Sequence, residues 1–322
     1  MSVPPPIPNP IERPLAPTYI IGHKNPDADA ICSAMAYAAF KEASGQPGYV
    51  AARCGNSNAR IDAILNRFGA TLPEFVGDVT PRVEDIMQYD PYVVSIDDTC
   101  ARALELLDLH DVRALPVLDR EGRLDGYVSI FGLGDYFIPK PKRATAMRKV
   151  HSSITAIIRC IGGTEVIAFD QAAVDELYVR VAAMELESFG KSATVEGIPN
   201  NKSIIVVGDR DDVHRRAISM GVRLIIVTGG HRMKAETLAL AKDAKVSVAY
   251  ADTDSATTAW AVRAATLIGG LVQRDAPRFS PQEKLSVIRR RIIQSNALIY
   301  HVIDESARLV GVFSKSDILK PV

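Results

Sequence analysis

The sequence predicts an α/β protein built from several domains, and three observations support this fold class. At 322 residues the chain is long enough for two or three domains with cores of their own. The opening part, 18–78, alternates short apolar runs with amphipathic helical segments. Further on, a unit of helix, strand, turn, strand and helix occurs twice. We therefore expect a partial doubly wound domain, followed by a repeated unit that a second α/β domain interrupts.

Composition excludes several classes of function. Lys plus Arg and Asp plus Glu number 38 each, so no overall charge draws the chain to nucleic acid or to an anionic membrane. No run of eighteen apolar residues predicts a membrane-spanning helix. Six prolines among the first fourteen residues predict a disordered leader over 1–17, which does not read as a secretion signal. Four scattered cysteines without a CxxC pair predict reduced thiols in a cytoplasmic protein.

The first strand and helix of the opening domain are predicted by a change of pattern near residue 22. An apolar run, Tyr19–Ile21, ends at Gly22, and a run of small and apolar residues extends from Ala30 to Phe40. This pattern predicts a buried strand, a tight turn and a helix packed closely against the strand. Pro26 supports the turn, because proline disfavours helical backbone in the residue before it. A strand over 49–52 and a helix over 58–68 continue the β-α-β-α order.

The turn carries His23, Asp27 and Asp29 within seven residues. One imidazole and two carboxylates at this spacing can converge on a hard divalent metal ion, and the carboxyl end of a strand is where open α/β sheets place their sites. The plainer interpretation is that the aspartates cap a helix while His23 faces water. The spacing favours the metal site, and we expect these three residues to be metal ligands.

The letters GHKNPDAD of this turn closely resemble GHxNPDxD, the first motif of the DHH phosphoesterases and in particular of the manganese-dependent (family II) inorganic pyrophosphatases. The resemblance implies that His23, Asp27 and Asp29 are ligands of a two-metal site. It also assigns 18–78 to the N-terminal part of a DHH domain.

An internal repeat follows. When the chain is shifted by 185 residues, Ser95–Ser129 lies over Ser280–Ser314 without a gap. The identical pairs include Val117/Val302, Asp119/Asp304, Arg123/Arg308, Leu124/Leu309, Gly126/Gly311 and Ser129/Ser314. A repeat whose copies lie this far apart, with different sequence between them, predicts an inserted domain and not a solenoid. We place the first copy at 79–138 and the second at 263–322.

Both copies resemble CBS domains, which end in the pattern G-h-h-[ST]-x-x-D. The second copy has the pattern complete in Gly311, Ser314 and Asp317, and the first keeps Ser129 but has Gly132 in place of the aspartate. A carboxylate at a helix start can accept ribose hydroxyls, while a hydroxyl and the helix N-terminus receive phosphate. The resemblance implies an adenine-nucleotide site, AMP or ADP, at these residues. The simpler alternative is that Asp317 only favours the start of a helix.

Two stretches separate the copies. We expect a basic linker and a helix over 139–163, the helix within HSSITAIIRCI from His151. Over 164–262, continuous apolar runs predict parallel strands at Ser203–Val207, Arg223–Val227 and Val246–Tyr250. This second part resembles the DRTGG domain over its whole length. Its Thr228–Gly230 loop can cradle an anion, although glycines at such turns more often serve packing.

The order of these parts resembles the CBS-containing family II pyrophosphatases across 18–322. The resemblance implies hydrolysis of pyrophosphate with paired Mn²⁺ (or Co²⁺) ions, regulated by adenine nucleotides at the CBS pair, in a homodimer. The later DHN and DHH motifs and the substrate domain of that family do not follow Asp317 in this sequence. We therefore expect this chain alone to be weakly active or inactive, either as a fragment or truncated product of such an enzyme or with a separate polypeptide that carries the missing half. The alternative is a non-catalytic nucleotide sensor, and a DHH phosphodiesterase acting on oligonucleotides is a weaker one.

Overall fold

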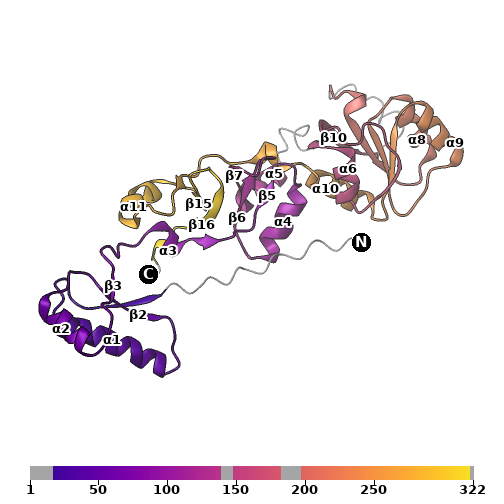
Figure 1. The fold of residues 1–322 in the computed structure, drawn as a ribbon. Helices are drawn as coiled ribbons and strands as arrows, with labels where there is room; N and C mark the ends of the chain where they lie inside the picture. Colours follow the sequence, from indigo (N-terminus) through magenta and orange to yellow (C-terminus); the bar gives the residue numbers. More distant parts are fainter. Residues whose placement is uncertain (1–16, 139–147, 183–196, 320–322) are drawn as a thin grey trace. The chain divides into compact units, whose positions relative to one another are not determined.

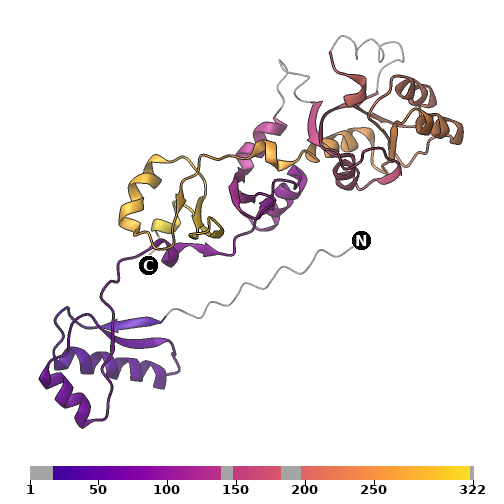
Figure 2. The same cartoon turned by 45° about the horizontal axis from the view of Figure 1, so that its top comes forward.

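The computed structural model describes residues 17–138, 148–182 and 197–319 and confirms the α/β class. The chain divides into two compact units (Figures 1 and 2). One unit holds the described residues up to Arg82 together with Lys284–Ser286, and the other holds the remainder.

The first unit is a parallel sheet of three strands in the order β1-β2-β3, with α1 and α2 on one face (Figure 1). Its elements are β1 (Thr18–Ile21), α1 (Ala28–Ala43), β2 (Tyr49–Arg53), α2 (Ala59–Arg67) and β3 (Glu74–Phe75). The predicted order is confirmed. Helix α2 begins where Asn58 accepts hydrogen bonds from the backbone N–H groups of Arg60 and Ile61, both at 3.1 Å.

Strand β1 is not buried, and this prediction was wrong. Tyr19 in β1 and Val50 in β2 are each 38% exposed, and none of the four β1 residues is buried. In the described part of the chain, helices cover only one face of this small sheet, so the side chains that point to the other face remain open to solvent (Figure 2).

The repeated unit forms two small sheets, one for each copy, with the orders β5-β6-β7 and β14-β15-β16-β4. The first copy consists of α3 (Val83–Ile86), β4 (Gln88–Tyr89), β5 (Val94–Ser95), α4 (Cys100–Leu109), β6 (Ala114–Leu118), β7 (Leu124–Ser129) and α5 (Ile130–Phe137). The second consists of η4 (Ile268–Leu271), β14 (Arg278–Phe279), α11 (Leu285–Gln294), β15 (Tyr300–Ile303), β16 (Leu309–Phe313) and η5 (Asp317–Leu319). The predicted unit of helix, strand, turn, strand and helix is confirmed in the first copy by α4, β6, β7 and α5.

A segment near the start of each copy pairs with the sheet of the other copy. Strand β4 lies antiparallel to β16, and Tyr127 of β7 exchanges both backbone hydrogen bonds with Gln273, at 2.9 and 2.8 Å. Glycine at positions 126 and 311 lets the paired segments come this close. A Cβ at Gly126 would lie 2.3 Å from Gln273 O, and one at Gly311 would lie 2.7 Å from the sulfur of Met87. The exchange therefore joins the two copies through their backbones.

The domain between the copies is a six-stranded sheet in the order β8-β10-β11-β12-β13-β9. Its elements are β8 (Lys149–Ser152), α6 (Ile154–Cys160), β9 (Thr164–Ile167), β10 (Asp175–Val181), η3 (Asn200–Lys202), β11 (Ser203–Val207), α8 (Asp211–Ser219), β12 (Leu224–Val227), α9 (Ala235–Asp243), β13 (Ser247–Tyr250) and α10 (Ser255–Ala264). Strands β10 to β13 are parallel, and every residue of β11 and β12 is buried. The predicted parallel strands are confirmed.

The stretch predicted as a basic linker with a helix contributes a strand and a helix to this sheet domain. Residues 139–147 lie outside the described part, but β8 pairs antiparallel with β10, and alternate residues Val150 and Ser152 are buried. The helix does not start at His151. It starts at Ile154, because the Ser153 side chain accepts from Ala156 N at 3.2 Å and caps α6.

All four cysteines are free thiols, as the sequence predicts. Cys100 is fully buried, and burial raises the pKa of its thiol to about 12. Among the described helices, none combines the length and the apolar character that crossing a membrane requires.

The core of the second copy contains a buried histidine. His301 in β15 is 1% exposed, lies opposite Arg278 of β14, and has its ring centroid 5.9 Å from that of Tyr127. Its Nε2 has no hydrogen-bond partner among the described residues. Burial, with a smaller contribution from the positive charge of Arg278, lowers the pKa of His301 from 6.5 to about 4. The imidazole is therefore neutral at pH 7.

This histidine predicts a loss of stability in acid. Unfolded chains take up a proton at His301 as the pH falls below 6.5, whereas the folded protein does so only near pH 4. The free energy of unfolding should therefore decrease between these two values, by about 3 kcal/mol from this group. We expect His301→Leu to flatten the pH dependence in urea denaturation series. The same change at exposed His231 is the control, and equal pH dependence in wild type and His301→Leu would contradict the prediction.

Candidate functional site

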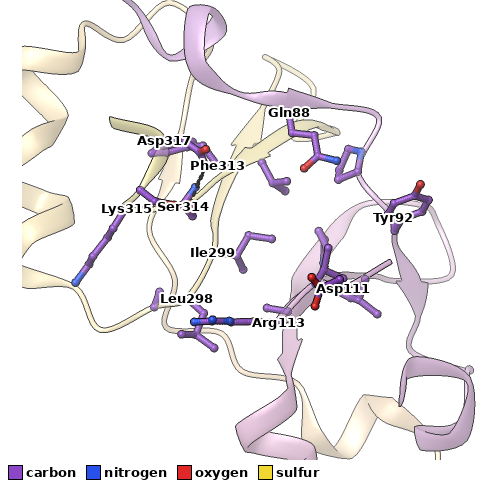
Figure 3. A pocket seen from close by; sticks show the side chains of 18 residues that line it. Gln88, Tyr92, Asp111, Arg113, Leu298, Ile299, Phe313, Ser314, Lys315 and Asp317 are labelled. Carbon is purple, nitrogen blue, oxygen red and sulfur yellow. Dashed lines mark hydrogen bonds between the residues drawn. The ribbon is translucent and has the colours of Figure 1, made fainter. Parts of the chain in front are cut away.

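A cavity of about 580 Å³ lies between the two copies of the repeat (Figure 3). It is lined by Gln88, Pro91, Tyr92 and residues 111–116 from the first copy and by residues 297–299 and 312–317 from the second. Its volume falls in the range of roughly 300–1,000 Å³ that small-molecule sites occupy. The lining on both sides comes from strand ends and the loops beside them, which the exchanged segments bring together.

One wall of the cavity is polar and contains two of the predicted residues. Asp317, at the start of η5, accepts hydrogen bonds on Oδ2 from the backbone N–H and the hydroxyl of Ser314, at 2.8 and 2.7 Å (Figure 3). Lys315 lies between them in the sequence and is exposed. The local pattern Ser-x-x-Asp thus fixes a carboxylate and a hydroxyl side by side, directly after the last strand.

The remaining walls combine apolar and charged groups. Figure 3 shows Ile299 between the Ser314–Asp317 pair and the first-copy residues Asp111 and Tyr92. The Tyr92 ring stacks on His110, with centroids 3.5 Å apart and planes 10° apart. An apolar surface flanked by carboxylates and by cations such as Arg113 suits a ligand that has a flat ring, hydroxyl groups and an anionic group.

The other two predicted nucleotide residues do not line this cavity. Ser129 is 2% exposed, and its hydroxyl donates to Gln273 Oε1 at 2.9 Å and accepts from Gly132 N at 3.1 Å, which caps α5. Gly311 lies within β16, at the point where β4 passes close to it. The structure therefore brings Ser314 and Asp317 together and gives Ser129 and Gly311 contacts within the protein.

Several lining residues were not predicted from the sequence. Gln88, Tyr92 and Arg113 line the cavity from the first copy and precede the end of the repeat unit, where most of the identical pairs lie. One signal was available, because the same shift of 185 residues places Gln88 on Gln273, outside the aligned segment that begins at Ser95.

The predicted metal ligands lie on the turn between β1 and α1. The turn packs closely against helix α1 and against the loop after β2. A Cβ at Gly22 would lie 2.7 Å from the Ala30 Cβ of α1, and one at Gly55, after β2, would lie 2.5 Å from Lys24 O of the turn. The predicted packing of the helix against the strand is confirmed. The turn therefore sits at the carboxyl ends of β1 and β2.

Two of the three predicted ligands are in contact. His23 Nε2 lies 3.4 Å from Asp27 Oδ1, and both side chains are exposed. Asp27 also caps α1 by accepting from Ala30 N at 2.9 Å, and this bond, with the neighbouring His23, lowers the pKa of the Asp27 carboxyl. Asp29 instead accepts from the Ser33 hydroxyl at 3.3 Å.

The donor types of this turn fit manganese or cobalt, which accept imidazole nitrogen and carboxylate oxygen. Within residues 17–138, 148–182 and 197–319, however, no three His, Cys, Asp or Glu side chains are grouped closely enough to hold a metal ion. The structure thus shows Asp27 both capping helix α1 and in contact with His23, while Asp29 is not grouped with them.

The Thr228–Gly230 loop serves packing. Gly229 N donates to Thr253 O at 2.8 Å, Gly230 N donates to Ala251 O at 3.2 Å, and both glycines have positive φ. The Thr228 hydroxyl is buried against Ser255 Oγ at 2.7 Å. Because these amides are already bonded within the protein, the loop is not an anion cradle.

Comparison with protein families identifies the parts of the second unit. Residues 156–265 match the DRTGG domain, and residues 83–133 and 268–322 match the CBS domain. The crystal structure of the CBS and DRTGG domains of the regulatory region of Clostridium perfringens pyrophosphatase, complexed with the activator diadenosine tetraphosphate, has a similar fold. It has a TM-score of 0.60 and 22% identity, over 73% of this chain and 100% of that one.

Comparison with whole proteins extends the similarity to the first unit. The chain is 27% identical to the cobalt-dependent inorganic pyrophosphatase of Clostridium perfringens over 92% of its length, and 23% identical to the probable manganese-dependent inorganic pyrophosphatase of Thermotoga maritima over 94%. It spans about half of each relative, 53% and 54% of their lengths. The chain is thus a homologue of the manganese- and cobalt-dependent inorganic pyrophosphatases, with a CBS pair and a DRTGG domain.

Proposed function

We propose that this chain senses adenine nucleotides for a manganese- or cobalt-dependent inorganic pyrophosphatase. The observation that carries the proposal is the cavity between the two CBS copies, with the Ser314–Asp317 pair in its wall. Its relatives are named pyrophosphatases, and the similar CBS–DRTGG structure holds a diadenosine activator.

The cavity suggests how each part of a nucleotide binds. The adenine ring lies on the apolar surface that Leu298 and Ile299 provide, and Asp317 accepts hydrogen bonds from the ribose hydroxyls. The phosphate lies near the Ser314 hydroxyl and the cations of Lys315 and Arg113, which line the cavity from the second and the first copy. AMP and ADP are the ligands that this arrangement fits.

The nucleotide site can be tested with an isosteric change. Asp317→Asn removes the negative charge that ribose hydroxyls donate to, and hydrogen bonds to charged groups contribute more than neutral ones. We expect AMP to bind at least about tenfold more weakly, measured by isothermal titration calorimetry. Asp252→Asn, at an exposed residue of the DRTGG domain, is the control. Unchanged affinity in a folded Asp317→Asn protein would remove the proposal.

For catalysis, we propose that His23, Asp27 and Asp29 hold a metal ion of the pyrophosphatase centre. A bound Mn²⁺ or Co²⁺ would polarise phosphoryl oxygens and activate a water molecule. The support is the contact between His23 and Asp27 and the donor types of the turn. Three ligands do not complete two metal shells, so pyrophosphate hydrolysis requires groups in addition to these.

Phosphate release from pyrophosphate tests this part of the proposal. With Mn²⁺ or Co²⁺, with and without AMP, we expect this chain alone to show little or no turnover and to bind at most one Mn²⁺ loosely. Any turnover should disappear in Asp27→Asn and persist in Asp62→Asn, which changes an aspartate of the neighbouring helix α2. Tight binding of two metal ions per chain would contradict the proposed ligand set.

A second candidate is a nucleotide sensor without catalysis of its own. It is favoured by the contrast between a well-formed cavity in the second unit and a metal turn in which only His23 and Asp27 touch. We propose that the open face of the first sheet, where Tyr19 and Val50 are exposed, packs against a further part of the DHH domain. AMP binding without turnover would favour this candidate.

We also propose a homodimer that forms through the CBS helices. Large apolar side chains are exposed on three of them: Leu109 at the end of α4, Phe131 on α5 and Ile293 on α11, each 65–68% exposed. Sedimentation equilibrium should give twice the mass of one chain, and Phe131→Glu should lower it. A single-chain mass for the wild type across micromolar concentrations would contradict the proposal.

A further inference from the structure

The shift of 185 residues that relates the two copies also relates the cavity to a second, quasi-equivalent position. We call it the first-copy position and define it by five residues. The pairs, cavity residue first, are Gln88/Gln273, Pro116/His301, Val312/Tyr127, Ser314/Ser129 and Asp317/Gly132. A symmetrical pair of CBS copies would place a ligand at each position.

Two large side chains occupy the first-copy position. Tyr127 stands where the cavity has Val312, is 4% exposed, and donates its hydroxyl hydrogen bond to Asp275 Oδ1 at 3.2 Å. His301 stands where the cavity has Pro116, and its ring lies beside that of Tyr127. The Tyr127 and His301 rings thus stand at the first-copy position where the cavity is lined by the smaller side chains of Val312 and Pro116.

The polar groups of the first-copy position are bonded to one another. Gln273 Oε1 accepts from the Ser129 hydroxyl, whose oxygen accepts from Gly132 N, so that amide, hydroxyl and backbone form one chain of hydrogen bonds. The corresponding Gln88 is exposed and lines the cavity. The serine hydroxyl that would meet a phosphate is therefore already bonded and buried.

The carboxylate is also missing. Gly132 replaces Asp317, so nothing at that point accepts hydrogen bonds from ribose hydroxyls. A Cβ added to Gly132 would lie 3.3 Å from Ser129 Oγ and 3.5 Å from Gln273 Cδ, which shows how closely the glutamine occupies the space.

We infer that each chain binds one nucleotide, at the cavity beside Ser314 and Asp317, because its own side chains occupy the first-copy position. This inference rests on the proposed nucleotide-sensing function. To enter the first-copy position, a nucleotide would have to break the Ser129–Gln273 bond and displace the buried Tyr127 and His301 rings. Binding should therefore follow a single-site isotherm, with no second class of sites at higher nucleotide concentration.

Calorimetric titration with AMP and with ADP tests the inference, using two serine variants matched by the repeat. We expect one nucleotide per chain in the wild type. Ser314→Ala should weaken binding by about tenfold, whereas Ser129→Ala should change the affinity by less than about twofold. Because Ser129→Ala removes a helix cap, thermal unfolding is recorded for each variant to confirm that it is folded at the titration temperature.

Amide hydrogen exchange provides a second readout. AMP should protect residues 314–317 and leave residues 127–132 unchanged. Two nucleotides per chain, protection of 127–132, or a larger loss of affinity in Ser129→Ala than in Ser314→Ala would overturn the inference while preserving nucleotide binding. If neither nucleotide binds at millimolar concentration, both the inference and the proposed function are wrong.

Discussion

The backbone pairing exchanged between the two CBS copies is the constraint on which the rest of the second unit depends. The Tyr127–Gln273 and β4–β16 pairings need backbones to approach where any side chain would collide, and Gly126 and Gly311 meet this need. The β4 segment carries Gln88 and leads into Tyr92, both of which line the cavity. Without the exchange, the polar wall of the second copy would face solvent and not a second wall.

The same dependence explains how much of the site was predictable. Ser314 and Asp317 were found because their geometry is local: a hydroxyl and a carboxylate three residues apart, directly after a strand. Tyr92 and Arg113 were not, because the cavity that they line forms only when β4 pairs with β16, a segment far away in the sequence. Ser129 occupies the same place in the repeat as Ser314, yet its partner, Gln273, is 144 residues distant in the sequence. Only the structure shows that Ser129 is bonded within the protein and does not line the cavity.

The errors in the fold have similar physical causes. A run of apolar residues predicts a buried strand only if something covers both faces, and β1 lies in a small sheet with helices on one face, so Tyr19 is exposed. Strand β8 was mistaken for linker and helix because its letters KVHS are short and half polar. The burial of its alternate residues and the ion pair of Lys149 with Glu176 both depend on the pairing of β8 with β10, which the sequence does not reveal. The continuous apolar runs of β11 and β12, by contrast, predict buried strands without knowledge of the neighbouring strands.

The filled first-copy position also has a structural consequence for the inserted domain. Helix α5 begins at the Ser129 cap and ends beside Tyr136, whose hydroxyl donates to Lys149 O at 2.8 Å and lies 2.7 Å from Thr266 Oγ1. Lys149 and Thr266 are where the chain enters and leaves the DRTGG domain, and Arg263 of α10 donates to Tyr136 O at 2.8 Å. A ligand at Ser129 would disturb the start of the helix that makes these contacts. Under the proposed single-site binding, the contacts by which α5 attaches to the DRTGG domain therefore do not meet a ligand at Ser129.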